Sequence, residues 1–240
     1  QTLISSAKLA GIPTLAVLDS WMHYVRRFSD YFKESGNYNP SSKEGEFKFL
    51  PDKIAIMDTL TKQKMIGLGF DPDSLVVTGN PNFDGLVELR EEFNFENKKK
   101  FRESFGFPEF GTLLYYSSQP LAKRGRKEQL GYDEKDVLDC LLEKLPEVYE
   151  SYKPSILIGV HRGQDEHEMD HYTKDSRYKI VADQKHHPWH AILYSDITIS
   201  PHSTTLVEAV YLRRPAISYQ PGLKTEDPLV INSLGVTEVV

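Results

Sequence analysis

Short apolar runs alternate with amphipathic stretches along almost the whole chain. Several of these runs are apolar at successive positions, which is typical of strands covered on both faces of a parallel sheet. They predict strands at residues 14–18, 53–57, 75–78, 112–116, 155–160, 178–181, 197–200 and 216–219. Helical periodicity predicts helices at residues 2–9, 21–32, 59–68, 134–152, 191–194 and 204–212, and turn-forming residues predict loops at 35–49 and 121–132. The alternation favours right-handed βαβ units and open, doubly wound sheets, so the predicted fold class is α/β.

A charged stretch interrupts this alternation once. Residues 86–105 include three consecutive lysines and predict one connecting helix, after which a new strand begins at residue 112. We therefore expect two Rossmann-like, doubly wound domains, residues 1–90 and residues 91–240. The chain starts inside a predicted helix without a methionine and stops in an apolar run. We accordingly expect a fragment of a larger protein, with the N-terminal domain incomplete.

The composition of the chain argues against several classes of function. The 240 residues are 39% hydrophobic, enough for a core, and the net charge of −6 argues against a protein that coats nucleic acid. No apolar run approaches the roughly 20 residues of a membrane-spanning helix. The single cysteine, Cys140, allows no intrachain disulfide, which suits a reducing compartment and a cytoplasmic location. The acidic stretch around His161, His167 and His171 lacks the full spacing of a zinc motif, so we expect no metal site.

Residues 196–222 carry the most informative pattern, a strand, a polar turn, a short helix and a second strand. Ser203, Thr204 and Thr205 sit where the helix begins, and hydroxyls at such positions cap free backbone N–H groups. The same N–H groups and the helix dipole can hold an anion. Glu208 follows one turn later on a neighbouring part of the helix surface. The pattern predicts a site for a nucleotide diphosphate and its ribose; the alternative is a capped helix with a solvated glutamate.

Three further polar residues end predicted strands, on the side where an open α/β sheet binds its ligand. Asp19 can act as a general base on an acceptor hydroxyl, or it can cap the helix that follows. His161 can exchange protons near neutral pH, and Arg162 can hold a diphosphate through two hydrogen bonds. The alternative for His161 is a ring satisfied by backbone groups.

Specific segments resemble a known group of enzymes. The runs LPDKIAIMD (50–58), LGF (68–70) and VVTGNP (76–81) resemble the end of the N-terminal domain of GT-B-fold nucleotide-sugar enzymes. The UDP-N-acetylglucosamine 2-epimerase group has a segment very similar to VTGNP (77–81). IGVHR (158–162) is similar to a strand of that group ending in a His-Arg pair, and residues 196–208 are similar to its nucleotide-diphosphate segment. The resemblance implies a GT-B-like pair of Rossmann-like domains.

The chain departs from the epimerases at two places. Where they carry a VEAGLRT-type segment this chain has VLDSWMHY (17–24), so Asp19 takes the place of the acid, and a second catalytic glutamate has no clear counterpart. Where they carry a glycine-rich turn this chain has Ser200-Pro201-His202-Ser203. That turn is closer to polymer-forming relatives, which transfer sugars or glycerol phosphate from nucleotide donors. Transfer is therefore favoured over epimerisation.

The resemblance implies a metal-independent glycosyltransferase of surface polysaccharide or glycoconjugate synthesis, without a cofactor. Its partners would be a nucleotide-sugar donor, such as a UDP-sugar, and a sugar or lipid-linked acceptor. Asp19 or His161 would be the catalytic base. The donor site would be formed by Ser117, Ser118, Arg162, His202, Ser203, Thr204, Thr205 and Glu208.

Other activities stay open at this point. They are a UDP-N-acetylglucosamine 2-epimerase-like isomerase, a polyol phosphotransferase that uses a cytidine nucleotide, and a catalytically silent nucleotide-sugar binding protein. Peripheral membrane association and formation of a homodimer are also left open.

Overall fold

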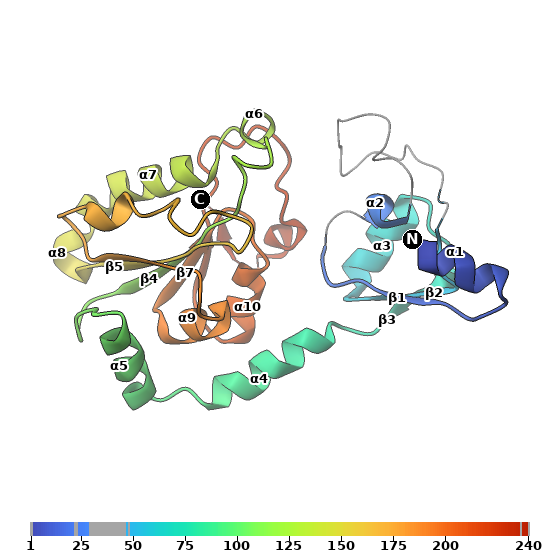
Figure 1. Cartoon of the computed structure of the whole chain (residues 1–240), viewed down its shortest axis with the longest axis horizontal. Helices are drawn as coiled ribbons and strands as arrows, with labels where there is room; N and C mark the ends of the chain where they lie inside the picture. The colour runs from blue at the N-terminus through green and yellow to red at the C-terminus, as the bar shows by residue number, and fades with distance from the viewer. Residues whose placement is uncertain (1, 22–23, 29–46, 48, 236, 240) are drawn as a thin grey trace. The chain divides into compact units, whose positions relative to one another are not determined.

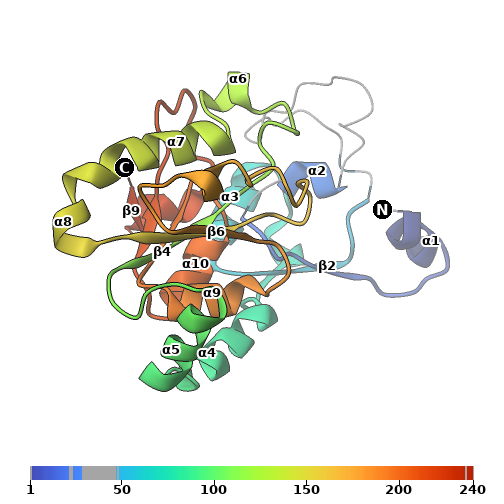
Figure 2. The same cartoon turned by 60° about the vertical axis from the view of Figure 1, so that its left-hand side comes forward.

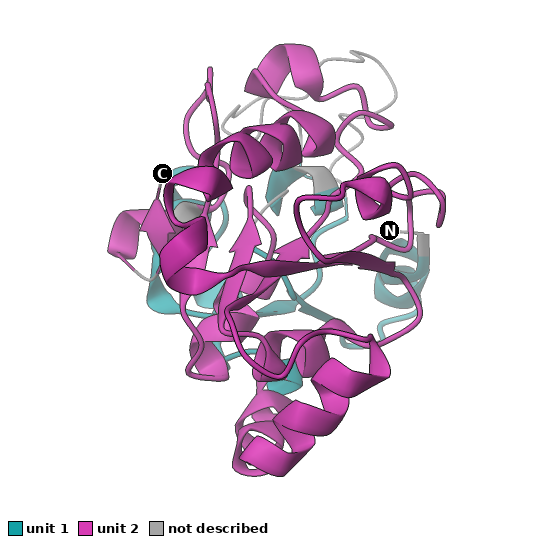
Figure 3. Cartoon of the chain, turned by 90° about the vertical axis from the view of Figure 1, so that its left-hand side faces the viewer, with its two compact units in different colours: residues 1–82 teal, residues 83–240 magenta. Residues whose placement is uncertain are grey.

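The structure is a computed structural model, and it describes residues 2–21, 24–28, 47, 49–235 and 237–239. The chain divides into two compact units, unit 1 from Gln1 to Asn82 and unit 2 from Phe83 to Val240 (Figure 3). Each unit has its own parallel sheet.

Unit 1 is built on a three-stranded sheet in the order β1-β2-β3. Its strands are β1 (Leu15–Val17), β2 (Lys53–Ile56) and β3 (Leu75–Val77), and both pairs are parallel. Its helical segments are α1 (Thr2–Leu9), α2 (Tyr24–Phe28), α3 (Thr59–Gly67) and the 3-10 turn η1 (Pro72–Ser74), and the 3-10 turn η2 (Pro81–Phe83) leads into unit 2. Residues from β2, α2 and α3 form its core, among them Ile54, Ile56, Phe28 and Met65.

Unit 2 is built on a six-stranded sheet in the order β6-β5-β4-β7-β8-β9, with every neighbouring pair parallel. The strands are β4 (Leu113–Ser117), β5 (Ser155–Gly159), β6 (Ile180–Asp183), β7 (Ile197–Ser200), β8 (Ala216–Ser218) and β9 (Glu238–Val239). The first strand, β4, lies in the middle, and the order reverses between β4 and β7. This is the strand order of the Rossmann fold, in which ligands bind beyond the carboxyl ends of the strands at the reversal.

Helices cover both faces of this sheet (Figures 1 and 2). On one face lies α7 (Glu134–Lys144), whose Val137 and Leu138 are fully buried in a core with Tyr116 and Ile158. On the other face lie α9 (Pro188–Tyr194) and α10 (Thr205–Tyr211). The remaining helical segments are α4 (Asp84–Glu91), α5 (Phe95–Ser104), α6 (Lys127–Leu130), α8 (Tyr149–Tyr152), η3 (Leu145–Glu147), η4 (Tyr172–Lys174) and η5 (Val230–Leu234).

A buried arginine ties α5 to the amino edge of this sheet. Arg102 is 4% exposed and donates to the carbonyls of Pro108 (2.9 Å) and Gly111 (2.8 Å). Its guanidinium also reaches Asp196, which accepts from the backbone N–H of Leu113 at 2.8 Å. The start of β4, the residue before β7 and helix α5 are thereby held together.

All eight predicted strands are present, and β9 is a ninth that the sequence did not predict. The single helix predicted at 86–105 is wrong: Asn94 is extended and caps a new helix by accepting from Asn97 N at 2.8 Å, which separates α4 from α5. The helix predicted at 134–152 is also interrupted. Pro146 has no N–H to donate to the preceding turn, so α7 ends at Lys144 and a 3-10 turn follows before α8.

Other boundaries differ as well. The expected domain division at 90/91 falls inside α4, whose Leu86 is fully buried, while the Phe83 ring beside it packs on Tyr211 at 4.7 Å between centroids. The chain divides instead between Asn82 and Phe83. The predicted loop at 121–132 contains α6. Most of the predicted helix at 21–32 outside α2, and most of the predicted loop at 35–49, lie outside the described residues.

Candidate functional site

The loops after the three central strands of unit 2 begin side by side. At the reversal of strand order, Ser200 Oγ at the end of β7 donates to the carbonyl of Ser117 at the end of β4, at 2.7 Å. Ser118 N donates to the carbonyl of Gly159, at the end of β5, at 3.0 Å. Ser117 and Ser118 are buried. The structure therefore brings together the segments that carry the predicted residues 117–118, 161–162 and 202–208.

His161 is exposed in the loop after β5. Its Nδ1 accepts a hydrogen bond from Gly163 N at 2.9 Å, so the neutral ring carries its proton on Nε2. Partial burial and the charge of Arg124 lower the pKa of His161. The ring is therefore neutral at pH 7 and presents an N–H donor. Arg162, the next residue, is exposed.

His202 is buried in the loop after β7. Its backbone N–H points to Gln119 Oε1 at 3.3 Å, and its Nδ1 lies 3.1 Å from the Tyr132 hydroxyl. Burial, together with the positive charges of Arg126 and Arg124, lowers the pKa of His202 to about 4. This ring is also neutral at pH 7.

The start of α10 differs from the expected capped helix. Ser203 Oγ accepts from Thr205 N at 3.3 Å, but the Thr204 side chain makes no capping hydrogen bond. Thr204 has helical dihedral angles (φ −61°, ψ −17°), whereas a capping residue is extended, so its hydroxyl is not aimed at the free N–H groups of the helix. The expectation that all three hydroxyls cap this helix is wrong for Thr204 and for Thr205, whose hydroxyl has no hydrogen-bond partner among the described residues.

Three of the predicted residues hold buried polar atoms that no described residue satisfies. They are the Ser118 hydroxyl, the Thr205 hydroxyl and Glu208 Oε2. Burial raises the pKa of Glu208, and the Trp189 side chain partly offsets this effect. Because buried polar atoms are nearly always paired, such a group beside the strand ends is typical of a place that a ligand completes.

The loop after β4 is held by two residues, Glu134 and Lys123, that no sequence motif marks as functional. Glu134, fully buried at the start of α7, accepts from the backbone N–H groups of Leu121 (2.9 Å) and Ala122 (2.8 Å). Burial raises the pKa of this carboxyl. Lys123 Nζ donates to the carbonyl of Gly163 at 2.7 Å, which joins this loop to the loop of His161.

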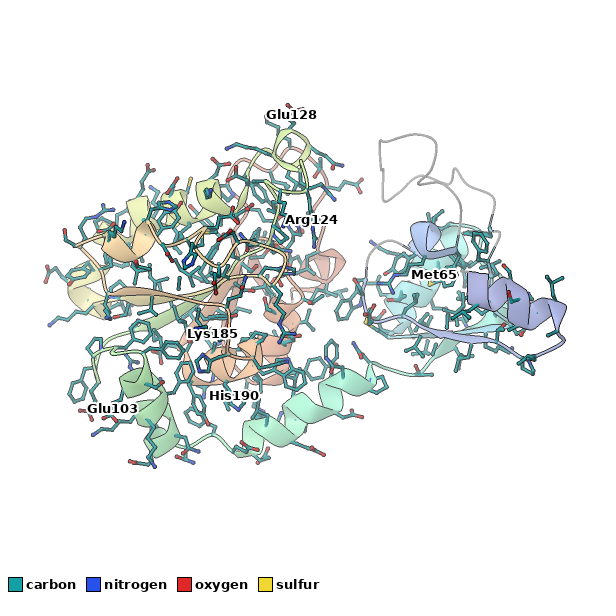
Figure 4. The ribbon with its side chains drawn as sticks, viewed as in Figure 1. Met65, Glu103, Arg124, Glu128, Lys185 and His190 are labelled. Atoms are coloured by element: carbon teal, nitrogen blue, oxygen red, sulfur yellow. The ribbon has the colours of Figure 1, made fainter. Side chains whose placement is uncertain are left out.

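Two arginines of the same loop add positive charge to the site. Arg124, labelled in Figure 4, acts on the pKa of both His161 and His202, and Arg126 acts on that of His202. Both arginines belong to the basic segment KRGRK (123–127), which is visible in the sequence. These two arginines therefore place positive charge near His161 and His202, beyond the carboxyl ends of β5 and β7.

Asp19 lies in unit 1, just beyond β1. Its carboxylate accepts from Arg27 Nη2 at 2.9 Å, and its side chain is 73% exposed. In the described part of the chain, no cluster of three or more His, Cys, Asp or Glu residues could hold a metal ion. Nor does any described helix have the length and apolar character needed to cross a membrane.

Comparisons with known proteins identify the fold. No protein-family model matches the sequence, and no curated protein matches it. Solved structures do match. A UDP-GlcNAc 2-epimerase from Methanocaldococcus jannaschii is 16% identical, with a TM-score of 0.60 over 99% of this chain and 62% of that one.

Two further solved structures are similar to this chain in fold. S. aureus MnaA with UDP is 11% identical, with a TM-score of 0.59 over 98% of this chain and 57% of that one. Anabaena HepE with UDP-glucose is 12% identical, with a TM-score of 0.54 over 91% of this chain and 56% of that one. The chain thus spans about three fifths of the length of these structures. It has the α/β fold of the GT-B nucleotide-sugar enzymes, with two Rossmann-like units, as the resemblance in its sequence predicted.

Proposed function

We propose that unit 2 binds the nucleotide part of a nucleotide-sugar beyond the carboxyl ends of β4, β5 and β7. We further propose that the protein is a metal-independent glycosyltransferase of surface polysaccharide or glycoconjugate synthesis. The observation that carries the binding site is the group of unsatisfied buried polar atoms on Ser118, Thr205 and Glu208. A nucleotide offers both phosphate oxygens and ribose hydroxyls, which would satisfy donors and acceptors respectively.

The charges around the site suit this ligand. Glu208 Oε2 would accept from the ribose hydroxyls, since it is a buried acceptor without a described donor. Arg162 and Arg124 would offset the phosphate charge, and the Nε2–H of His161 would donate to a phosphate oxygen. Donors placed in this way stabilise the diphosphate as it leaves.

The hydrogen bonding of the two candidate bases favours Asp19. A base needs a free lone pair, and the neutral His161 ring has its only lone pair, on Nδ1, occupied by Gly163. The carboxylate of Asp19 is largely exposed and has lone pairs on both of its oxygens. In the proposed reaction its carboxylate takes the proton of the acceptor hydroxyl. The acceptor oxygen bonds to the anomeric carbon, and the diphosphate departs with the electron pair of the broken bond.

A second candidate is a 2-epimerase-like isomerase. It is favoured by the segments 50–58 and 76–81 and by the fold shared with UDP-GlcNAc 2-epimerases, although fold alone does not define a reaction. An epimerase removes and returns the proton at sugar C2. During turnover in deuterated water it would therefore place deuterium at C2, whereas a transferase would not.

Calorimetric titration with UDP, CDP and GDP tests the binding proposal. We expect one of the three to bind, and we expect Glu208→Ala to weaken it by roughly tenfold or more, because hydrogen bonds to a charged group are worth ~1.5–3 kcal/mol. Glu150→Ala is the control, since Glu150 is exposed on α8, before the amino end of β5.

The outcome of this titration, together with a turnover assay on a nucleotide-sugar that binds, distinguishes among the candidate functions. Failure of all three diphosphates to bind would contradict the proposal. A preference for CDP would favour the polyol phosphotransferase. Tight binding of a nucleotide-sugar that is never turned over would favour the silent binding protein.

A further inference from the structure

A directional chain of hydrogen bonds ends at His202. It runs from the carbonyl of Pro201 through Ser218, Gln220 and Tyr132 to the His202 ring. The chain crosses from the end of β8 to Tyr132, two residues before α7, and every side chain in it is buried. Because each side chain has a fixed number of protons to donate, the direction of every bond can be worked out.

The direction of the hydrogen bonds is set first at the carbonyl oxygen of Pro201, which can only accept. Pro201 O accepts the Ser218 hydroxyl at 2.6 Å, which uses the one proton of that hydroxyl. Ser218 Oγ must then accept from its other partners. These are Gln220 Nε2 and Asn232 Nδ2, each at 2.9 Å.

The bond to Ser218 fixes the orientation of the Gln220 side-chain amide. With Nε2 directed at Ser218, its oxygen Oε1 faces the Tyr132 hydroxyl at 3.0 Å, and the hydroxyl donates its proton there. The Tyr132 oxygen is left to accept from His202 Nδ1 at 3.1 Å. The network therefore fixes a neutral His202 with its proton on Nδ1 and a lone pair on Nε2.

The surroundings keep His202 in this form. The ring is 5% exposed, Tyr132 is fully buried, and Gln220 is 6% exposed, so solvent has little access to the bonds between them. The charged groups that act on the ring are Arg126, Arg124 and Asp227, and the two arginines disfavour a second proton on it.

We propose that His202 offers Nε2 as a fixed, neutral acceptor to a hydroxyl of the ligand, on either the ribose or the transferred sugar. Tyr132 and Gln220 are the positioning residues that hold this tautomer. The contact between His202 and the ligand rests on the proposed function. This contact differs from a diphosphate-binding role for His202, because a nitrogen that carries a lone pair and no proton cannot donate to a phosphate oxygen.

The tautomer is tested without any ligand. Nitrogen-15 NMR of the histidine side chains at pH 7 is expected to show His202 protonated on Nδ1, with its signals assigned by their loss in His202→Asn. In Tyr132→Phe, which removes the acceptor of that proton, we expect a mixture of tautomers in a protein whose other histidine signals are unchanged. A proton on Nε2 or a charged ring in the parent protein would overturn the proposal.

Two substitutions test the contact with the ligand. His202→Asn keeps an N–H near the Nδ1 position and removes Nε2, whereas His202→Gln can place an oxygen where Nε2 was. Affinities for uridine, UDP and UDP-GlcNAc are measured, with thermal melting as the check on folding. We expect His202→Asn to weaken binding about fivefold, the worth of one neutral hydrogen bond, and His202→Gln to recover most of it.

The three probes locate the hydroxyl. A loss seen already with uridine assigns it to the ribose, and a loss seen only with UDP-GlcNAc assigns it to the sugar. Equal affinities of His202→Asn and the parent protein for all three probes would overturn the contact. If the parent protein binds none of them and neither CDP nor GDP, the proposed function and the ligand contact fall together, while the NMR result still decides the tautomer.

Discussion

His161 and His202 are held in opposite tautomers at the carboxyl edge of the same sheet. Nδ1 of His161 accepts from Gly163 N, which leaves an N–H donor on Nε2. Nδ1 of His202 donates to Tyr132, which leaves a lone pair on Nε2. One ring thus suits a phosphate oxygen and the other a hydroxyl, and a nucleotide-sugar carries both groups.

Replacing Asp19 should separate catalysis from binding. If the Asp19 carboxylate is the general base, Asp19→Asn should slow release of the nucleoside diphosphate from the nucleotide-sugar by roughly 10²–10⁴-fold. The affinity for the diphosphate measured by calorimetry should stay unchanged. Asp73→Asn, an exposed acid of the same unit, is the control. Turnover at the parent rate in Asp19→Asn would rule out its role as base.

Folding stability should depend on pH through His202. Its pKa falls from 6.5 to about 4 on folding, so between these values the unfolded chain binds more protons than the folded one. The contribution to stability is complete above about pH 6.5 and is lost as the pH falls towards 4. We expect the parent protein to lose roughly 2–3 kcal/mol more than His202→Asn between pH 7 and pH 4.5 in urea unfolding. Parallel curves for the two proteins would contradict this assignment.

Arg102 should matter far more for stability than its neighbours on α5. Arg102→Ala leaves the carbonyls of Pro108 and Gly111 without their donor and weakens the support of Asp196. The expected cost in the free energy of unfolding is roughly 2–5 kcal/mol, as for other buried charges that lose their partner. Lys100→Ala, which breaks an exposed pair with Glu96, should cost less than about 0.5 kcal/mol. Similar midpoints in denaturant for both variants would contradict the structural role of Arg102.

The strands β4, β5 and β7 were predictable because burial on both faces of the sheet requires apolar residues at successive positions. The predicted strand at 197–200 coincides with β7, whose last three residues are buried. The short strand β9 has two exposed residues, so no such run marks it. The break between α4 and α5 depends on one capping residue, Asn94, inside a charged stretch that otherwise has helical character.

The candidate site was predictable only in part. Ser117, His161 and His202 lie at or just beyond the ends of strands, and the carboxyl ends of parallel strands share one edge, so the pattern of elements already brings them together. Tyr132 and Gln220 could not be found in this way. Tyr132 is 70 residues from His202 in the sequence, and only the packed structure shows that the two side chains are hydrogen bonded.

The most direct test of the account is where a nucleotide binds on unit 2. Two-dimensional amide NMR spectra would be recorded with and without the diphosphate that calorimetry selects. We predict that the largest shifts fall on the backbone amides of Ser118, His202 and Thr205, with much smaller shifts at Glu150 on α8. Shifts centred elsewhere in the protein, with these amides unmoved, would contradict a nucleotide site at the carboxyl ends of β4, β5 and β7.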